Sequence, residues 1–214
     1  MKETMTIHKA LCELKTLDAR ISGATADLEL VVPNKHTNSK IGGVAIGEFA
    51  KQAVSDFQSA KTLINRRNAI KQAVTRSNAT TKVTIGGEEY TVAEAIDMKT
   101  NGIGYLQSLR DKLAKQLATA KKRCDMENDR LEDRADEYIR TLYGGSDLKN
   151  MGDEVKKVRE DFIASQTFEL VDPINADKEL KALDDKIAEF MSDVDSALSV
   201  SNALTSVEVE YKTL

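Results

Sequence analysis

The sequence repeats short words far apart in the chain, and this feature constrains its fold most strongly. SNATTKVTI at 77–85 and SNALTSVEV at 201–209 share five of nine positions without gaps. Three further pairs match in the same way: MTIHKAL (5–11) with YTVAEAI (90–96), ELKTLDARI (13–21) with ELKALDDKI (179–187), and LELVVP (28–33) with FELVDP (168–173). Four matched pairs indicate an architecture that uses the same local structures twice.

Each repeated word predicts a change of secondary structure. In the words that contain Thr6 and Thr91, a short strand runs into a helix, and the threonine hydroxyl can cap the first free amides. Glu94 follows Thr91 by three residues and would complete a capping box. In the two SNA words a helix ends, because Ser and Asn are weak in helix interiors and the Thr/Val alternation that follows is typical of strands.

Between the repeats, the sequence predicts a β-hairpin. Gly86-Gly87 separates two alternating runs, so that residues 81–85 pair with 88–92. Single strands are predicted at both ends of the chain, at 3–7 and 206–211. A lone hairpin is marginally stable in water, so we expect one or both terminal strands to join it. Both SNA helix ends would then meet at one small sheet.

Composition favours long solvated helices for the rest of the chain. Charged residues make up 31% of it, aromatic residues 5%, and Trp is absent. Apolar residues spaced by three and four predict helices at about 7–22, 46–77, 92–143 and 174–200. Gly144-Gly145 would end the third helix, 34–45 is a polar loop, and 146–166 contains a short amphipathic helix.

The predicted fold is therefore mainly α with a small β part (α+β). Long antiparallel helical-bundle or coiled-coil hairpins end in a small antiparallel sheet, in a single elongated domain over 1–214. We expect six apolar side chains to be largely buried, within the chain or against a copy of it: Leu109, Leu113, Leu117, Leu183, Ile187 and Val194.

The residues with reactive side chains do not form a recognisable catalytic, cofactor or metal motif. His8 and His36 lack further ligands at zinc spacing and are expected on the surface. Cys12 and Cys124 lie at apolar helical positions and are expected to be buried free thiols. We predict no catalytic residue, no cofactor and no metal, and hence no enzyme.

Two charged clusters allow more than one interpretation. An acidic group could bind a cation or act in acid–base chemistry: Glu127, Asp129, Glu132, Asp133, Asp136 and Glu137. Arginines three or four residues away, at 123, 130 and 134, favour a salt-bridged helix face instead. Arg66 and Arg67 either lie on the surface, or cross a helix interface or reach a partner.

Charge and hydropathy exclude two classes of partner from the expected function. The net charge is -4 with both signs interleaved, so nucleic acid is not expected. No apolar run approaches the roughly 20 residues of a membrane span, and the polar N-terminus does not fit a signal peptide. We expect a soluble protein made in a cytosol.

The run from KIGGVAIGEFAKQAV to TIGGEEYTVAEAI, and the N-terminal TIHKALCELKTLDARI, resemble proteins encoded among the structural genes of tailed bacteriophages. The order of INRRNAI, SNATTKV, the Gly hairpin, TVAEAI, LDDKI and SNALTSV is also similar to small septicolysin-like helical proteins of bacteria. The septicolysin label implies a pore former, although the sequence lacks an amphipathic membrane hairpin. Neither resemblance implies a catalytic residue.

The phage resemblance implies a virion component of the tail, neck or baseplate, made in the host cytoplasm. Its partners would be other virion proteins and copies of itself in a multi-copy assembly. The alternative is a soluble helical interaction module or toxin-like module outside any particle. We expect the strands to supply interaction residues: Val83, Ile85, Tyr90, Val207, Val209 and Tyr211.

Overall fold

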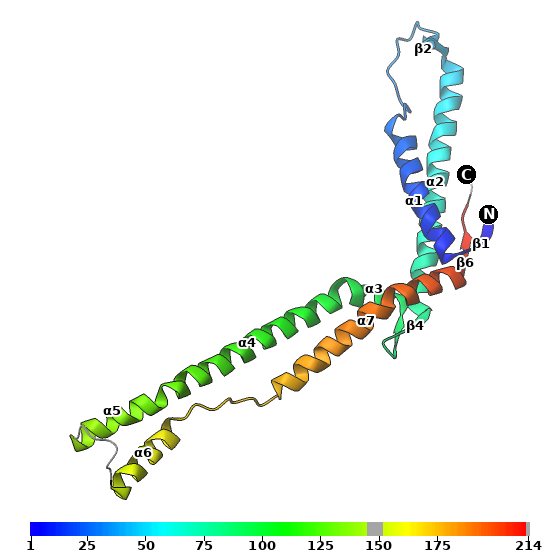
Figure 1. Ribbon diagram of the computed structural model, residues 1–214. Helices are drawn as coiled ribbons and strands as arrows, with labels where there is room; N and C mark the ends of the chain where they lie inside the picture. The colour runs from blue at the N-terminus through cyan, green and yellow to red at the C-terminus, as the bar shows by residue number, and fades with distance from the viewer. Residues whose placement is uncertain (145–151, 213–214) are drawn as a thin grey trace. The chain divides into compact units, whose positions relative to one another are not determined.

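The computed structural model describes residues 1–144 and 152–212, and within them it is mainly helical with three two-stranded antiparallel sheets (Figure 1). This confirms the predicted fold class of mainly α with a small β part. The chain divides into two compact units, Met1–Asn101 with Glu189–Leu214, and Gly102–Ala188. We describe each unit by itself, and the single elongated domain stays a prediction.

The first unit holds all the strands that the structure describes. Its elements in chain order are β1 (Lys2–Thr6), α1 (Ile7–Ala26), β2 (Lys40–Ile41), β3 (Val44–Ala45), α2 (Ile46–Thr80), β4 (Lys82–Ile85), β5 (Glu88–Thr91), α3 (Val92–Asp97), most of the π-helical turn η1 (Met98–Gly102), the second half of α7 (Ala176–Leu204), and β6 (Ser206–Glu210). Helices α1 and α2 pack side by side (Figure 1). The predicted polar loop at 34–45 contains the small hairpin β2–β3.

The predicted central hairpin is confirmed, but its expected third strand is wrong. β4 pairs with β5 across Gly86 and Gly87, whose φ angles of 55° and 77° give the turn that matches strand twist. β1 pairs with β6 instead, with Met5 opposite Val207. We call β1–β6 the terminal sheet and β4–β5 the hairpin sheet. Each SNA helix therefore ends at a sheet of its own, and not at a shared one.

Both sheets are stable without a third strand because each packs one face on helices. In the hairpin sheet, the ring of Tyr90 meets that of Phe190 on α7 edge to face, with centroids 5.7 Å apart. In the terminal sheet, the main chains at the two ends of the chain also form hydrogen bonds with each other, since Tyr211 donates its N–H to the Met1 carbonyl at 3.0 Å.

The repeated words make the same main-chain connections in both sheets. Thr81 donates its N–H to the Ser77 carbonyl at 2.8 Å, and Thr205 donates to the Ser201 carbonyl at 2.9 Å. The carbonyl of each threonine then accepts from the first residue of a helix, α3 for Thr81 and α1 for Thr205. Val92 donates to the Thr81 carbonyl at 2.8 Å, and Ile7 donates to the Thr205 carbonyl at 2.9 Å.

Burial repeats as well, position by position. Val83 and Val207 are each 9% exposed, and Ile85 and Val209 are each 1% exposed. Seven residues before each SNA word, Ile70 on α2 and Val194 on α7 are both fully buried. The two copies of the word therefore fold to the same local structure, a helix end followed by a strand with its odd-numbered side chains buried.

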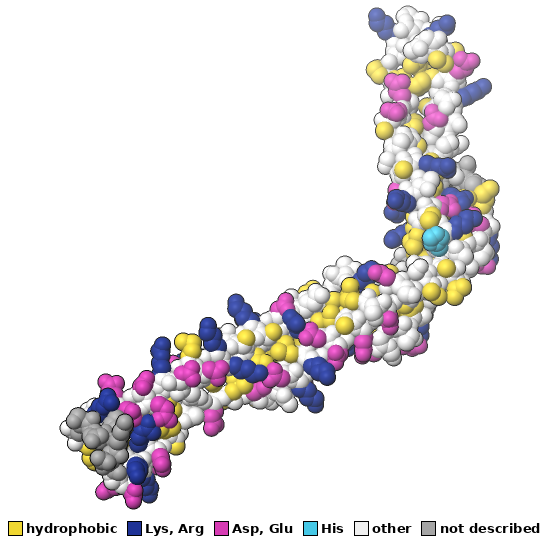
Figure 2. All heavy atoms as spheres, viewed as in Figure 1, with side chains coloured by type: hydrophobic (Ala, Val, Ile, Leu, Met, Phe, Trp, Pro, Cys, Tyr) yellow, Lys and Arg dark blue, Asp and Glu magenta, His cyan; other side chains and the backbone are white. Residues whose placement is uncertain are grey.

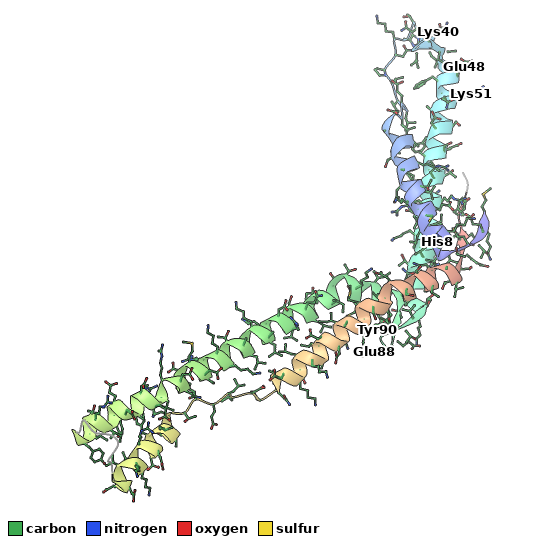
Figure 3. The ribbon with its side chains drawn as sticks, viewed as in Figure 1. His8, Lys40, Glu48, Lys51, Glu88 and Tyr90 are labelled. Atoms are coloured by element: carbon green, nitrogen blue, oxygen red, sulfur yellow. The ribbon has the colours of Figure 1, made fainter. Side chains whose placement is uncertain are left out.

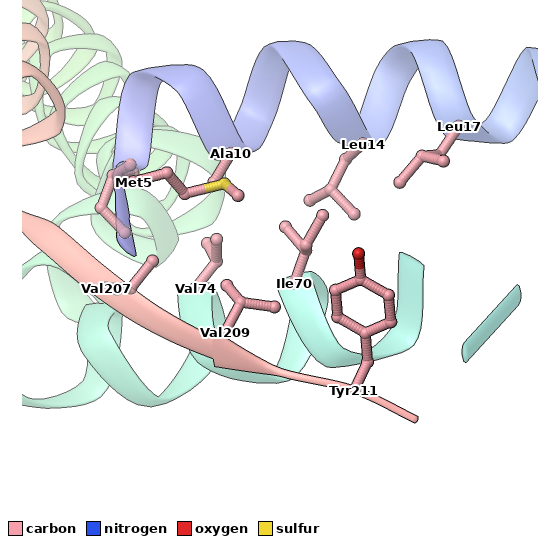
Figure 4. Close-up of a cluster of buried hydrophobic side chains, with 10 residues drawn as sticks. Met5, Ala10, Leu14, Leu17, Ile70, Val74, Val207, Val209 and Tyr211 are labelled. Carbon is pink, nitrogen blue, oxygen red and sulfur yellow. The ribbon is translucent and has the colours of Figure 1, made fainter. Parts of the chain in front are cut away.

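The core of the first unit lies where α1 and α2 meet the terminal sheet (Figure 4). Leu14 and Leu17 of α1 and Ile70 and Val74 of α2 supply one side of this cluster, since they recur at helical spacing. The terminal sheet supplies the other side with Met5, Val207, Val209 and Tyr211.

The second unit contains α4 (Ile103–Asp129), α5 (Leu131–Tyr143), α6 (Asp153–Gln166) and the first half of α7. Apolar side chains follow α4 and α7, with charged side chains beside them (Figure 2). Arg110 binds Asp184 at 2.8 Å and Lys121 binds Asp177 at 2.8 Å, so ion pairs join α4 to α7.

The predicted helix at 92–143 is a nearly continuous run of α3, η1, α4 and α5. Its predicted end is confirmed at Gly144, which has a φ of 65° and donates to the Arg140 carbonyl at 2.9 Å. Of the predicted helix within 146–166, α6 begins at Asp153, and residues 146–151 lie outside the described residues.

Of the six predicted core side chains, Leu117 and Val194 are buried. Leu113, Leu183 and Ile187 are half-buried. Leu109 is 57% exposed, so its burial within the chain is wrong. A narrow apolar stripe on a long helix is covered only where another helix lies against it.

Candidate interaction surface at the terminal sheet

Arg66 of α2 connects both α1 and the terminal sheet. Its Nε donates to Glu13 Oε1 at 2.5 Å and its Nη2 to Glu3 Oε2 at 3.1 Å. Nη1 donates to the Tyr211 hydroxyl, and the guanidinium lies 5.0 Å from the centre of that ring. The hydrogen bond to Glu13 raises the pKa of Arg66 above its ordinary value. Arg66 thus crosses a helix interface, one of the alternatives that the sequence left open.

The structure places the six predicted interaction side chains in two groups, and both groups face inward. Val207, Val209 and Tyr211 are buried in the terminal sheet. In the hairpin sheet, Val83 and Ile85 are buried and Tyr90 is half-buried. Their role in interaction stays a prediction, and within this structure it can rest only on the main chain of the strands.

Tyr90 is held by a neighbour on its own strand. Its hydroxyl donates to Glu88 Oε2 at 2.5 Å (Figure 3). This hydrogen bond, together with partial burial, raises the pKa of Tyr90 to about 12. The phenol is therefore neutral at physiological pH, and the bond fixes the ring against Phe190.

The hydrogen-bond pattern of the terminal sheet shows which main-chain groups of β6 are free. Tyr211 and Thr205 both bond to β1 or the residues beside it, and antiparallel partners alternate between bonded and non-bonded pairs. The N–H and C=O groups of Ser206, Glu208 and Glu210 therefore point away from β1. Within residues 1–144 and 152–212, no hydrogen bond to these groups is seen.

A groove of about 1080 Å³ runs beside this free edge, between β6 and α2. On the α2 side it is lined by Ala69, Ala73 and Ser77, which recur every four residues and so lie in one row along the helix. Gln72, Arg76 and Thr80 lie on the same wall, and Lys2 and Lys212 line the groove on the side of the terminal sheet. These small side chains of the row leave room beside the strand edge. The groove was not predicted from the sequence, because only the side chains of the strands were considered and not those of the helix beside them.

His8 and Cys12 form a pair that sequence reasoning missed. They lie one helical turn apart on α1 with Nε2 and Sγ 3.9 Å apart, and both side chains are exposed. The i, i+4 spacing on a predicted helix could have indicated this contact. The predicted burial of Cys12 is wrong, because its position faces away from α2, whereas Cys124 is half-buried. Neither cysteine forms a disulfide within the described residues.

The acidic cluster of α4 and α5 binds arginine mainly from a neighbouring helix. Arg159 of α6 binds Asp136 at 2.8 Å and also contacts Glu132. Along the helix, Arg134 and Glu127 approach only to 3.7 Å. In the part of the chain that the structure describes, no group of three or more His, Cys, Asp or Glu could hold a metal ion, and no helix is long and apolar enough to cross a membrane.

Apolar side chains are exposed over both units. Val31 and Val171 are 92% and 88% exposed and occupy the same position in the words LELVVP and FELVDP. Both words are extended segments without regular structure. Leu204 and Tyr105 are 78% and 75% exposed. Among the described residues, more large apolar side chains are exposed than buried.

No protein-family model, no curated protein and no solved structure matches this sequence.

Proposed function

We propose that this chain is an assembly component of a larger protein complex and acts through protein–protein contacts. The observation that carries this proposal is the excess of large apolar side chains on its surface over those in its core. Scattered apolar residues are normal on a monomer, but an excess of this kind is typical of surfaces that other chains cover.

The accessible surface supports the same conclusion. The chain exposes 15023 Å², whereas a compact monomer of 23.6 kDa exposes about 9800 Å². Two separate compact units of half that mass would together expose about 12000 Å². The chain thus exposes more surface than two separate compact units would, and binding partners would cover the excess.

We place this assembly role in the virion of a tailed bacteriophage, as a part of the tail, neck or baseplate. The support is the resemblance of residues 40–96 and of the N-terminal helix to proteins encoded among phage structural genes. In this proposal the partners are other virion proteins and further copies of the chain. The chain has no catalytic step, and the exposed pair His8 and Cys12 is incidental to its function.

The test is to locate the protein and to measure its association. We expect mass spectrometry of particles purified from the producing cells to find the chain in several copies. Val31→Glu and Val171→Glu should reduce incorporation without a loss of stability, because both side chains are almost fully exposed. Glu29→Gln and Glu169→Gln change a polar residue two positions earlier and serve as matched controls.

Two results would contradict the proposal. One is a purified protein that sediments as a monomer at every concentration and is absent from particles. This result would favour a module that acts outside any particle. The other is a measurable turnover that survives in the apolar-to-Glu variants. Deletion of β6 is not a suitable test, because it also removes the buried side chains of Val207 and Val209 from the core.

A further inference from the structure

We propose that the free edge of β6 binds an extended, basic segment of a partner protein, which adds to the terminal sheet as a third strand. The inference rests on the proposed assembly function and names the chemistry of one partner. It is carried by three properties of the same place: the free main-chain groups of β6, the groove beside them, and the charges on the outer face of the strand.

The main chain provides the first contact. Ser206, Glu208 and Glu210 each direct an N–H and a C=O away from β1, which makes a row of donors and acceptors at strand spacing. An extended segment can satisfy this row with its own main chain, as in other cases of strand addition. β6 carries no Pro and no bulge that would block such pairing.

The groove provides the space. A neighbouring strand lies about 4.8 Å from its partner. The α2 wall of the groove carries one row of short side chains, Ala69, Ala73 and Ser77, with Gln72, Arg76 and Thr80 beside it. A strand in the groove would turn every second side chain toward this wall, so these side chains must be small. The alternate side chains would lie on the outer face, beside those of β6.

Two positions on the outer face of β6 favour positive charge in a neighbouring strand. Glu208 and Glu210 are exposed there, and opposite charges on neighbouring strands stabilise a sheet. Glu208 already binds Lys2 of β1 at 2.8 Å, whereas Glu210 has no ion pair among the described residues. Arg76 lies on the α2 wall and Lys212 follows β6, so cations of the bound segment suit only the outer-face positions beside Glu208 and Glu210. The fitting segment therefore carries Lys or Arg at these positions and small, uncharged residues on the inner face.

The same charges disfavour pairing between the β6 strands of two copies. An antiparallel pair centred on the strand would place Glu208 opposite the same residue of the second copy, and like charges directly opposite destabilise a sheet. Acidic residues on an exposed edge are one way in which proteins prevent self-pairing. This register of self-pairing is therefore disfavoured, and we assign the edge to a different chain that places basic residues opposite Glu208 and Glu210.

The test uses the full chain and a short acetylated and amidated peptide of sequence Lys-Ala-Lys-Ala-Lys. In amide NMR spectra, millimolar peptide should shift the resonances of Ser206, Glu208 and Glu210 most. Glu-Ala-Glu-Ala-Glu of the same length should bind at least about tenfold more weakly, because Glu210 then faces a like charge. For Glu210→Lys this preference should shrink or reverse.

Main-chain pairing is tested by N-methylation of the peptide. In an added strand, only alternate residues point their N–H at β6. Methylation of either all Lys or all Ala amides should therefore abolish binding, and the other set should leave it intact. Equal effects of the two sets would overturn strand addition, since a purely electrostatic contact has no such alternation.

Occupation of the groove is tested by Ala73→Leu, which fills it and should weaken binding at least about tenfold. Ala79→Leu adds the same volume on the same helix outside the groove and is the control. If Ala73→Leu proves unfolded, the N-methylated peptides decide alone.

Absence of shifts at 206–210 with millimolar peptide would overturn the inference. If the chain still enters particles, only this inference fails. If the peptide binds but the chain is absent from particles, only the proposed function fails.

Discussion

The terminal sheet joins strands from the two ends of the chain, whereas the hairpin sheet joins neighbours across Gly86 and Gly87. Both use the same repeated words and the same main-chain connections. They differ in the entropy that must be overcome to close them, because the cost of closing a loop rises with its length. The terminal sheet must therefore be stabilised by more contacts.

The residues at equivalent positions show where these contacts come from. Leu14 follows the cap residue Thr6 by eight residues and is buried under the terminal sheet. Lys99 follows the cap residue Thr91 by the same number and contacts Asp195 at the surface. Arg66, which binds two carboxylates, and Phe190, which packs on Tyr90, each lie eleven residues before an SNA word. Thus the terminal sheet, which joins the two ends of the chain, has both additional buried apolar side chains and a polar network.

The largest expected effect is that of Ile70→Ala. This side chain is fully buried in the terminal cluster, and its loss should lower the free energy of unfolding by about 2–5 kcal/mol. Val194→Ala, at the equivalent position, removes one carbon fewer and should cost less. Ile70→Val introduces the residue found at the equivalent position 194 and should lower the free energy of unfolding by about 0.5–1.5 kcal/mol. Urea denaturation of the three variants measures this, and a smaller loss for Ile70→Ala than for Val194→Ala would contradict the proposed difference.

A smaller effect is expected when the polar network of the terminal sheet is broken. Arg66 is about a quarter exposed, and Arg66→Met leaves Glu3 and Glu13 without their cation. We expect a loss of about 1–3 kcal/mol in the free energy of unfolding, below that of a fully buried pair.

Arg67→Met is the control for this variant. It breaks a more exposed pair with Asp18 and should cost at most about 1 kcal/mol. The double variant Arg66→Met with Glu13→Gln should recover part of the loss, because one uncompensated charge is removed. Equal losses in Arg66→Met and Arg67→Met would show that the network adds nothing beyond a surface pair.

Local rules predicted the local structure well. The Gly-Gly hairpin, the Thr caps, the helix end at Gly144 and the ends of the SNA helices each depend on a few neighbouring residues, and the structure contains all of them. The pairing of β1 with β6 could not be predicted in this way, because alternation marks a strand but not its partner.

The candidate site was predicted only in part. The sequence identified β6 as an interaction element, but Val207 and Val209 face the core, and the free groups belong to Ser206, Glu208 and Glu210. Which residues of a strand face an open edge depends on the register, and register is set by the partner strand. The groove is formed by the small side chains of Ala73 and its neighbours on α2. Small residues on a helix do not predict a groove unless it is known that a strand lies beside the helix.

The smallest expected difference concerns the threonine caps that start α1 and α3. Thr6 accepts from Lys9 N–H at 3.2 Å, and Thr91 accepts from Glu94 N–H at 3.2 Å. Only Thr91 has a capping box, since the Glu94 carboxylate also accepts from Thr91 N–H at 2.7 Å and from its hydroxyl at 2.8 Å. Thr6→Ala should cost about 1 kcal/mol near neutral pH, and Thr91→Ala somewhat more because Glu94 also loses a partner.

The two caps should also respond differently to acid. The hydrogen bonds from Thr91, the backbone bond first, lower the pKa of Glu94 below its ordinary value. A carboxylate with a lowered folded-state pKa stabilises the fold above its unfolded pKa and loses this effect as the pH falls through the folded value.

The cost of Thr91→Ala, measured by urea denaturation, should therefore shrink between about pH 6 and about pH 3, while that of Thr6→Ala stays constant. Glu94→Gln should remove the pH dependence, and Lys9→Glu should introduce it at α1. Because the Thr91→Ala variant keeps the backbone N–H bond to Glu94, a constant cost of Thr91→Ala over this range would mean that the hydroxyl bond from Thr91 to Glu94 contributes nothing beyond the threonine cap.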